Sequence, residues 1–154
     1  MCLSGEARLS WVALFAAVNE STWEHLKLAF FPALIFALFE CPFIRNKIKN
    51  FSVAKTLSFY VMPLLIIALF YLYLVIFRKD LLFWDIFVFV FSVGIGQIVS
   101  YKILVSKELS KTVRSTFKVL FFVILIAFLF FTYLPPYNFL FKDPISGGYG
   151  IIIK

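Results

Sequence analysis

The sequence predicts an all-α integral membrane protein, built as one bundle of transmembrane helices with no separate soluble domain. Of its 154 residues, 63% are hydrophobic and 22 are phenylalanine, and the mean hydropathy is +0.99. Soluble domains average about 45–50% apolar residues. A soluble chain of this length could not bury so much apolar surface, whereas a bilayer solvates it. The apolar residues also fall into runs of membrane-spanning length that are separated by short charged loops.

Four runs are long enough to cross the roughly 30 Å hydrocarbon core, which takes about 20 helical residues. We expect a polytopic bundle with full spans at about residues 22–41, 57–77, 81–101 and 117–134. In the first span, Pro32 predicts a kink and Cys41-Pro42 predicts the end of the helix. Pro135-Pro136 ends the fourth span, and the tail 135–154 follows. We treat residues 1–154 as a single membrane domain.

Residues 9–18 form a shorter apolar run of half the length of a crossing, which predicts a short interfacial or re-entrant helix. One unbroken helix from Leu9 to Cys41 would be about 50 Å long. It would also bring Glu20 and Glu24 toward the middle of the bilayer, at a cost of about 3 kcal/mol for each carboxylate. We therefore expect a break in the chain near residue 20.

The sequence Ser21-Thr22-Trp23-Glu24 supplies a helix start at that break, because it matches the capping box. In this motif Ser21 is the N-cap, and Glu24 reaches back toward the backbone from the third helical position. A carboxylate in the first turn also interacts favourably with the positive end of the helix dipole.

The distribution of positive charge predicts the orientation. Loops 42–56 and 102–118 hold four and five Lys or Arg residues, whereas residues 1–27, 78–80 and 135–154 hold two each. By the positive-inside rule, the two basic loops are cytoplasmic. The motif 19–27 and the tail are then extracytoplasmic in a multi-pass protein of the cell membrane.

The formal net charge of +7 resides mostly in these two loops. Basic loops beside apolar spans favour anionic lipids as partners, at loops 42–56 and 102–118, over nucleic acid. Lys107, Lys111, Arg114 and Lys118 recur at three-to-four-residue spacing, which predicts an amphipathic helix on the membrane surface.

The segment from Asn19 to Lys27 gathers two carboxylates, an amide, a Trp, a Lys and the single His of the chain into nine residues. One interpretation is a catalytic acid–base pair or a site for a divalent metal, with Glu20, Glu24 and His25 as candidates. Asp143 could reach it from a folded-back tail. Such ligands suit Zn, Mn or Fe. The other interpretation is helix capping and interfacial anchoring, since a lone His without a His-x3-His or Glu-x2-His pattern is weak evidence for a zinc enzyme.

Further polar residues are candidates for binding. Asp85 and Glu40 are carboxylates near the ends of spans, where Lys27 or Arg78 could pair with Asp85, and Arg45 with Glu40. The stretch Ser92-x-Gly94-x-Gly96-Gln97 favours close helix packing over an ion path. In the tail, Asp143-Pro144 and three glycines favour turns. The full set of binding candidates is Asn19, Trp23, Lys27, Asp85, Gln97, Asp143 and Tyr149.

The motif Asn19-Glu20-Ser21-Thr22-Trp23-Glu24-His25-Leu26-Lys27 and the ending Pro135-Pro136…Phe141-Lys142-Asp143-Pro144…Gly148-Tyr149-Gly150-Ile151 resemble those of a family of small, uncharacterised prokaryotic integral membrane proteins. The resemblance covers nearly the whole chain and implies a membrane fold with no assigned activity. It also implies a further transmembrane helix before the motif, where this chain has 18 residues.

Three functions stay open at this point. The first is a binding, transport-associated or assembly component with a polar motif at the outer mouth of the bundle, and a second copy of the chain is one candidate partner. The second is a membrane-embedded enzyme, in which metal-assisted hydrolysis of a lipid or isoprenoid substrate would use Glu20, Glu24 and His25. The third is a small oligomeric proton-coupled transporter with Asp85 and Gln97 along its path.

Overall fold

The computed structural model describes residues 21–45, 47–79, 81–143 and 147–149, and this part of the chain folds into four long helices. They are α2 (Thr22–Ile44), α3 (Phe51–Phe77), α4 (Leu82–Leu104) and α5 (Lys111–Tyr133). Each is long and apolar enough to cross a membrane, with a mean hydropathy of 1.8 to 2.5 over its most apolar 18 residues. The expected all-α class with four spans is confirmed. The short helix expected at 9–18 lies outside the described residues.

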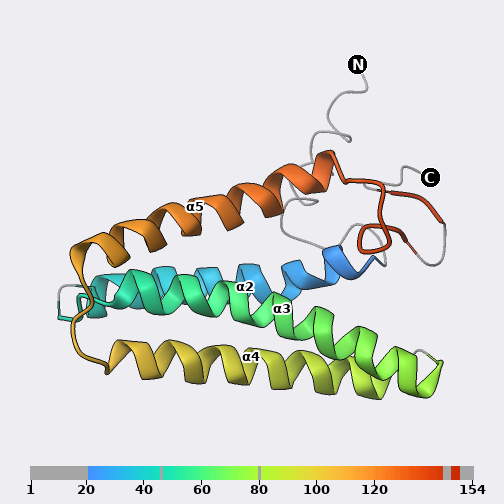
Figure 1. Ribbon diagram of the computed structural model, residues 1–154, viewed down its shortest axis with the longest axis horizontal. Coiled ribbons are helices and arrows are strands. Elements are labelled where there is room, and N and C mark those ends of the chain that lie inside the picture. The colour runs from blue at the N-terminus through green and yellow to red at the C-terminus, as the bar shows by residue number, and fades with distance from the viewer. Residues whose placement is uncertain (1–20, 46, 80, 144–146, 150–154) are drawn as a thin grey trace.

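The helices run in alternating directions, so the loops gather at two ends (Figure 1). The α2–α3 and α4–α5 connections, which carry the two basic loops, lie together at the left of the view. The α3–α4 connection, the start of α2 and the tail lie at the right. The motif and the tail therefore share one end of the bundle, as the alternation of spans predicts.

Four helix ends lie three or more residues from their expected positions, and one of them is the end of α4, at Leu104 instead of residue 101. Helix α2 continues through Pro42 to Ile44, and the Arg45 N–H donates to the Cys41 carbonyl at 3.0 Å, so the backbone ladder resumes after the proline. Proline costs the helix one donor, and an apolar helix near its end tolerates this loss. Helices α3 and α5 each begin six residues earlier than expected.

The early start of α5 corrects the expectation of a separate amphipathic surface helix. Lys111, Arg114 and Lys118 lie in the first two turns of α5, while Lys107 lies in the loop before it. Long basic side chains can extend toward the polar surface from the first turns of a membrane helix, and the helix can therefore begin among charged residues.

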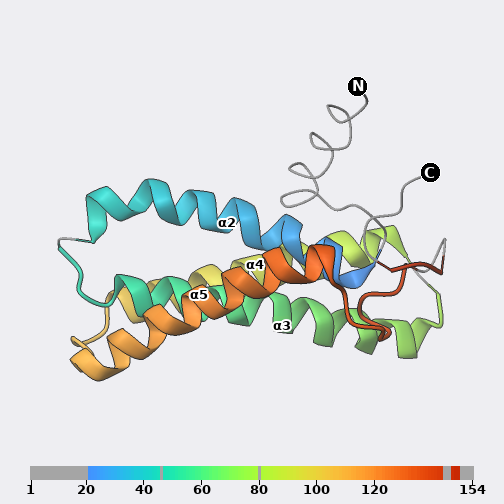
Figure 2. The same ribbon diagram turned by 90° about the horizontal axis from the view of Figure 1, so that it is seen from above.

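Helix α3 is the central helix, since it packs against α2, α4 and α5. A column of aromatic rings fills the space between α2, α3 and α5. The Phe30 ring stacks on Phe128 with centroids 4.4 Å apart and meets Phe59 edge-on at 5.3 Å. Figure 2 shows α2 lying to one side of the bundle and approaching α5 toward the end that carries the tail.

The α3–α4 contact is built on small residues. Ser92, Gly96 and Ser100 are buried at four-residue intervals along α4. A Cβ atom on Gly96 would lie 2.3 Å from Cγ of Met62, so only glycine allows this approach. The expected packing role is confirmed at Gly96 but is wrong for Gly94, whose Cβ would meet no atom within 4 Å.

Candidate functional site

The site begins at the N-terminus of α2. Ser21 has an extended backbone (φ −71°, ψ 149°), and its Oγ accepts a hydrogen bond from the Glu24 N–H at 3.4 Å. This is the N-cap arrangement that the capping box predicts. The cap therefore fixes where α2 starts and places Glu24 in its first turn.

The Glu24 carboxylate forms an ion pair with a partner that the sequence reasoning did not consider. The Lys27 ammonium donates to Oε2 of Glu24 at 2.7 Å, and the two side chains are 0% (Lys27) and 3% (Glu24) exposed. Residues three apart are neighbours on a helix surface, which brings the two charges together. A buried charge is tolerated when it is paired, so each member of this pair offsets the desolvation of the other.

Trp23 joins the start of α2 to the tail. Its backbone N–H donates to the Leu140 carbonyl at 3.0 Å, which satisfies one of the donors that a helix N-terminus leaves without an intrahelical partner. Its ring stacks on Phe128 of α5 at 4.8 Å and on Phe141 of the tail at 4.7 Å, and meets Phe131 edge-on at 5.5 Å. The indole is therefore enclosed between a transmembrane helix and the tail.

The described part of the tail is held by a tight turn. The Asp143 N–H donates to the Gly148 carbonyl at 3.0 Å, and the Gly147 N–H donates to the Asp143 carbonyl at 2.9 Å. Gly147 has φ +71°, a conformation that glycine adopts without strain. Asp143 is 4% exposed, and Tyr149 lies opposite Lys142 in an antiparallel bridge. The described part of the tail thus folds back onto the bundle, an arrangement that the sequence allows but does not decide.

Helix α3 completes this arrangement. The Tyr71 hydroxyl lies 3.2 Å from Oγ1 of Thr22, and its ring meets Phe139 of the tail at 5.3 Å. The first turn of α2, the tail and the halves of α3 and α5 beside the tail therefore form one packed assembly. We call it the outer cap, after the side of the membrane that the sequence predicts for it (Ser21–Lys27, Tyr71, Phe128, Phe131 and residues 137–143).

His25 lies on a different side of α2 from the buried pair. It is exposed, and its Nδ1 lies 3.0 Å from the Ser21 carbonyl oxygen, while Glu24 faces the interior. Among the described residues, no three His, Cys, Asp or Glu side chains gather as metal ligands would. Asn19 and Glu20 lie outside the described residues, so the metal and catalytic candidates stay predictions.

Two further polar contacts join helices outside the cap. The Tyr73 hydroxyl of α3 donates to the Asp85 carboxylate of α4. Glu40 of α2 pairs with Lys55 of α3, and not with Arg45 as expected. Gln97, the other candidate on α4, is half-buried on the flank of that helix.

Both pairs, Tyr73–Asp85 and Glu40–Lys55, could have been predicted from the register of antiparallel helices. Tyr73 and Asp85 each stand six positions from Lys79 in the α3–α4 turn, and Glu40 and Lys55 are equally far from the middle of the α2–α3 loop. Residues equidistant from a tight connection lie at the same height in an antiparallel pair.

Comparison with known proteins assigns the family. No curated protein and no solved structure matches the chain. The model of DUF6512, a family of unknown function, matches residues 2–151, nearly the entire sequence. The chain, with its four candidate transmembrane helices and its motif and tail packed together, belongs to the DUF6512 family of unknown function.

Proposed function

We propose that the protein is a non-catalytic, multi-pass component of the cell membrane that works by binding or assembly, with the outer cap as its preformed extracytoplasmic binding unit. The observation that carries this proposal is the enclosure of Trp23, whose ring is stacked between Phe128 and Phe141 while its N–H bonds the tail at Leu140. A rigid, pre-ordered surface binds a partner without the entropy cost of ordering itself.

The chemistry of the motif supports a structural use of its residues. Ser21 caps the helix, Trp23 anchors the tail, and Glu24 and Lys27 neutralise each other in the interior. A general base must come within hydrogen-bond reach of the proton that it abstracts. A carboxylate that is 3% exposed and engaged by an ammonium group is poorly placed for that task.

The transporter alternative receives less support from the placement of its two candidates. Asp85 and Gln97 are both on α4, twelve residues apart. At about 1.5 Å and 100° per residue, they are separated by roughly 18 Å along the axis and by about 120° around it. Two groups so placed do not line one path along a single helix face.

The same proposal includes the orientation. The two basic connections lie at one end of the bundle and the outer cap at the other (Figure 1). With nine of the fifteen Lys and Arg residues in loops 42–56 and 102–118, the positive-inside rule favours cytoplasmic loops and an extracytoplasmic cap.

A photo-crosslinking experiment tests the binding role. A benzophenone amino acid replaces Tyr137, which is 87% exposed on the tail, and the matched control replaces Phe122, which is 59% exposed on the flank of α5. The proposal predicts a discrete crosslinked species in living cells for position 137 alone, and its loss when Trp23→Ala is added. No discrete species at position 137, or one that persists in the Trp23→Ala background, would contradict it. Light scattering of the purified detergent complex then shows whether the partner is a second copy of the chain.

Elemental analysis distinguishes this proposal from the alternative of a membrane-embedded, metal-dependent enzyme. The purified protein and its His25→Ala variant are both assayed for Zn, Mn and Fe. Stoichiometric metal that disappears in the variant would establish the metal site and overturn the proposal of a non-catalytic component. The proposal predicts equal, substoichiometric traces of metal in both proteins.

A further inference from the structure

The two basic loops at the inner end of the bundle are joined into a single body by Asn50. This side chain is 2% exposed. Its Nδ2 donates to the carbonyls of Ile103, Ser106 and Lys107 at 3.3, 3.3 and 3.0 Å, and its Oδ1 accepts from the Leu109 N–H at 3.0 Å. One residue of the α2–α3 loop therefore fixes the path of the whole α4–α5 loop.

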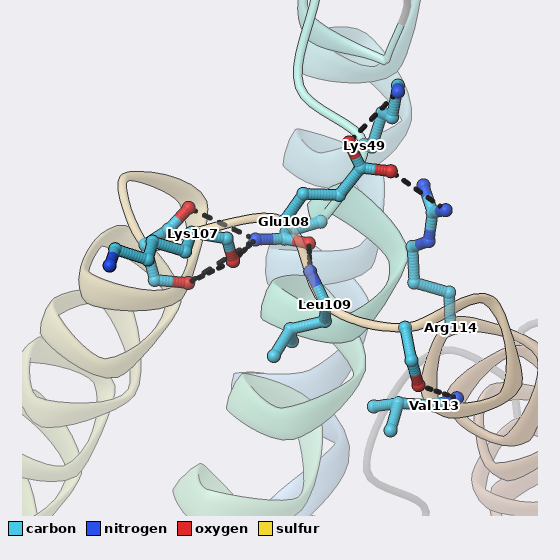
Figure 3. Close-up of polar contacts among 9 residues, drawn as sticks. Lys49, Lys107, Glu108, Leu109, Val113 and Arg114 are labelled. Atoms are coloured by element: carbon cyan, nitrogen blue, oxygen red, sulfur yellow. Dashed lines mark hydrogen bonds and ion pairs between the residues drawn. The ribbon is translucent and has the colours of Figure 1, made fainter.

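Glu108 makes the second connection between the loops (Figure 3). One carboxylate oxygen accepts from Lys49 at 2.9 Å, and the other pairs with Arg114 at 3.0 Å. The pKa of Glu108 lies below its ordinary value, chiefly because of the hydrogen bond from Lys49 and then because of the positive charges of Lys49 and Arg114. Glu108 is the single acidic residue in residues 45–50 and 102–118, where eight Lys and Arg residues occur.

Three further cations of the two basic loops have no acidic partner among the described residues. Lys47, Lys107 and Lys111 are exposed, and within the described part of the chain none of them forms an ion pair. Between the loops lies an open hollow of about 250 Å³, whose polar wall comes from Lys47, Lys49, Asn50, Ser106 and Glu108. We call this surface, together with Lys107, Lys111 and Arg114, the inner platform.

We propose that the inner platform is a binding site for the phosphate headgroup of an anionic lipid, and that Glu108 is an internal anion that competes with the headgroup for Lys49 and Arg114. A lipid is the occupant that the location favours. The platform caps the ends of four apolar helices, which is the height at which the phosphates of the surrounding leaflet lie. Clustered basic residues beside a membrane span attract anionic lipid.

The competition follows from the geometry of the ion pairs. Lys49 is 64% exposed and Glu108 is 48% exposed, and exposed ion pairs are held weakly because water and salt screen them. A phosphate offers the same acceptor oxygens as the carboxylate to Lys49 and Arg114. It can also reach the exposed, uncompensated lysines. The loops need not move for this exchange, since Asn50 holds them in place.

Native mass spectrometry of the full chain in detergent tests the site by titration with phosphatidylglycerol and, separately, with phosphatidylcholine of the same acyl chains. We expect tighter binding of phosphatidylglycerol. The double variant Lys107→Ala/Lys111→Ala should lose roughly fivefold in affinity for each lysine removed. The matched variant Arg78→Asn/Lys79→Ala removes equal charge from the exposed α3–α4 turn at the opposite end and should bind as the wild type does. Both faces are accessible in detergent, so the result does not depend on the proposed orientation or on the proposed binding role of the outer cap.

Glu108→Gln is the deciding variant. If the carboxylate competes with the headgroup, its removal should tighten phosphatidylglycerol binding by about fivefold, the reverse of the lysine effect. If Glu108 only braces the loops, the variant will bind phosphatidylglycerol equally or more weakly, and the competition is refuted. Equal binding of the two lipids by the wild type, or equal losses in the two double variants, would overturn the site itself.

Discussion

Replacing Trp23 by Ala should release the tail from the bundle while leaving the four helices in place. Phe141 is 5% exposed, and its ring is stacked on the Trp23 indole at 4.7 Å. Burying a Phe side chain stabilises by about 1.5–3 kcal/mol. A stacked aromatic pair adds about 0.5–1.5 kcal/mol. Because Phe131 also contacts Phe141, at 5.5 Å, we assign about 2 kcal/mol of the docking free energy to Trp23.

Hydrogen exchange measured by mass spectrometry on the peptide 137–143 reads out this docking. A loss of about 2 kcal/mol corresponds to roughly 30-fold faster exchange when the tail opens and closes quickly. The control is Trp84→Ala, which removes the same side chain from the contact between α3 and α4, where Trp84 stacks on Phe77 at 5.4 Å. Unchanged tail exchange in Trp23→Ala, or the same acceleration in Trp84→Ala, would refute the role that we assign to Trp23.

Three further predictions concern the pairing and packing of single residues. Lys27→Met leaves the buried Glu24 carboxylate without this partner and should lower the free energy of unfolding by about 3–5 kcal/mol; in detergent denaturation, adding Glu24→Gln should restore part of that loss. Gly96→Ala should destabilise by about 1–3 kcal/mol through overpacking, whereas Gly94→Ala, in open space, should leave the unfolding midpoint unchanged or raise it. The Lys49 hydrogen bond holds the pKa of Glu108 below its ordinary value of 4.5. The ionised Glu108 therefore stabilises the fold above pH 4.5, and this stabilisation is lost as the pH falls through the pKa of the folded state. The difference in melting temperature between the wild type and Glu108→Gln should shrink to zero on acidification.

The fold could be predicted because membrane helices are specified by composition. Runs of apolar residues gave four spans, and the cap residue Ser21 gave the start of α2 to the residue. Helices α3 and α5 begin earlier than expected because charged residues such as Lys55 and Lys111 favour a loop when the sequence is considered alone. In the structure, Lys55 is a helical residue that pairs with Glu40. The expected end at Cys41 was wrong because an isolated proline near a helix terminus removes one hydrogen bond and leaves the next one intact.

The outer site could be predicted only in part. The juxtaposition of motif and tail follows from the alternation of spans, and the turn in the tail follows from its glycines. The Glu24–Lys27 pair was not expected because the sequence pattern favours Glu24 as a capping residue or metal ligand and Lys27 as a partner of Asp85. Their burial depends on tertiary packing, which no local pattern reveals. His25 was grouped with Glu24 by proximity in sequence, but neighbouring residues on a helix point about 100° apart.

The arrangement of the two ends of the bundle across the membrane is the central claim, and cysteine labelling in intact cells tests it most directly. In a background without Cys2 and Cys41, a single cysteine is placed at Tyr137 in the tail or at Val105 in the α4–α5 loop, which are 87% and 63% exposed. A membrane-impermeant maleimide should label position 137 in intact cells and position 105 only after the cells are lysed. Labelling of position 105 in intact cells, with or without labelling of position 137, would contradict four spans with cytoplasmic basic loops and an extracytoplasmic cap.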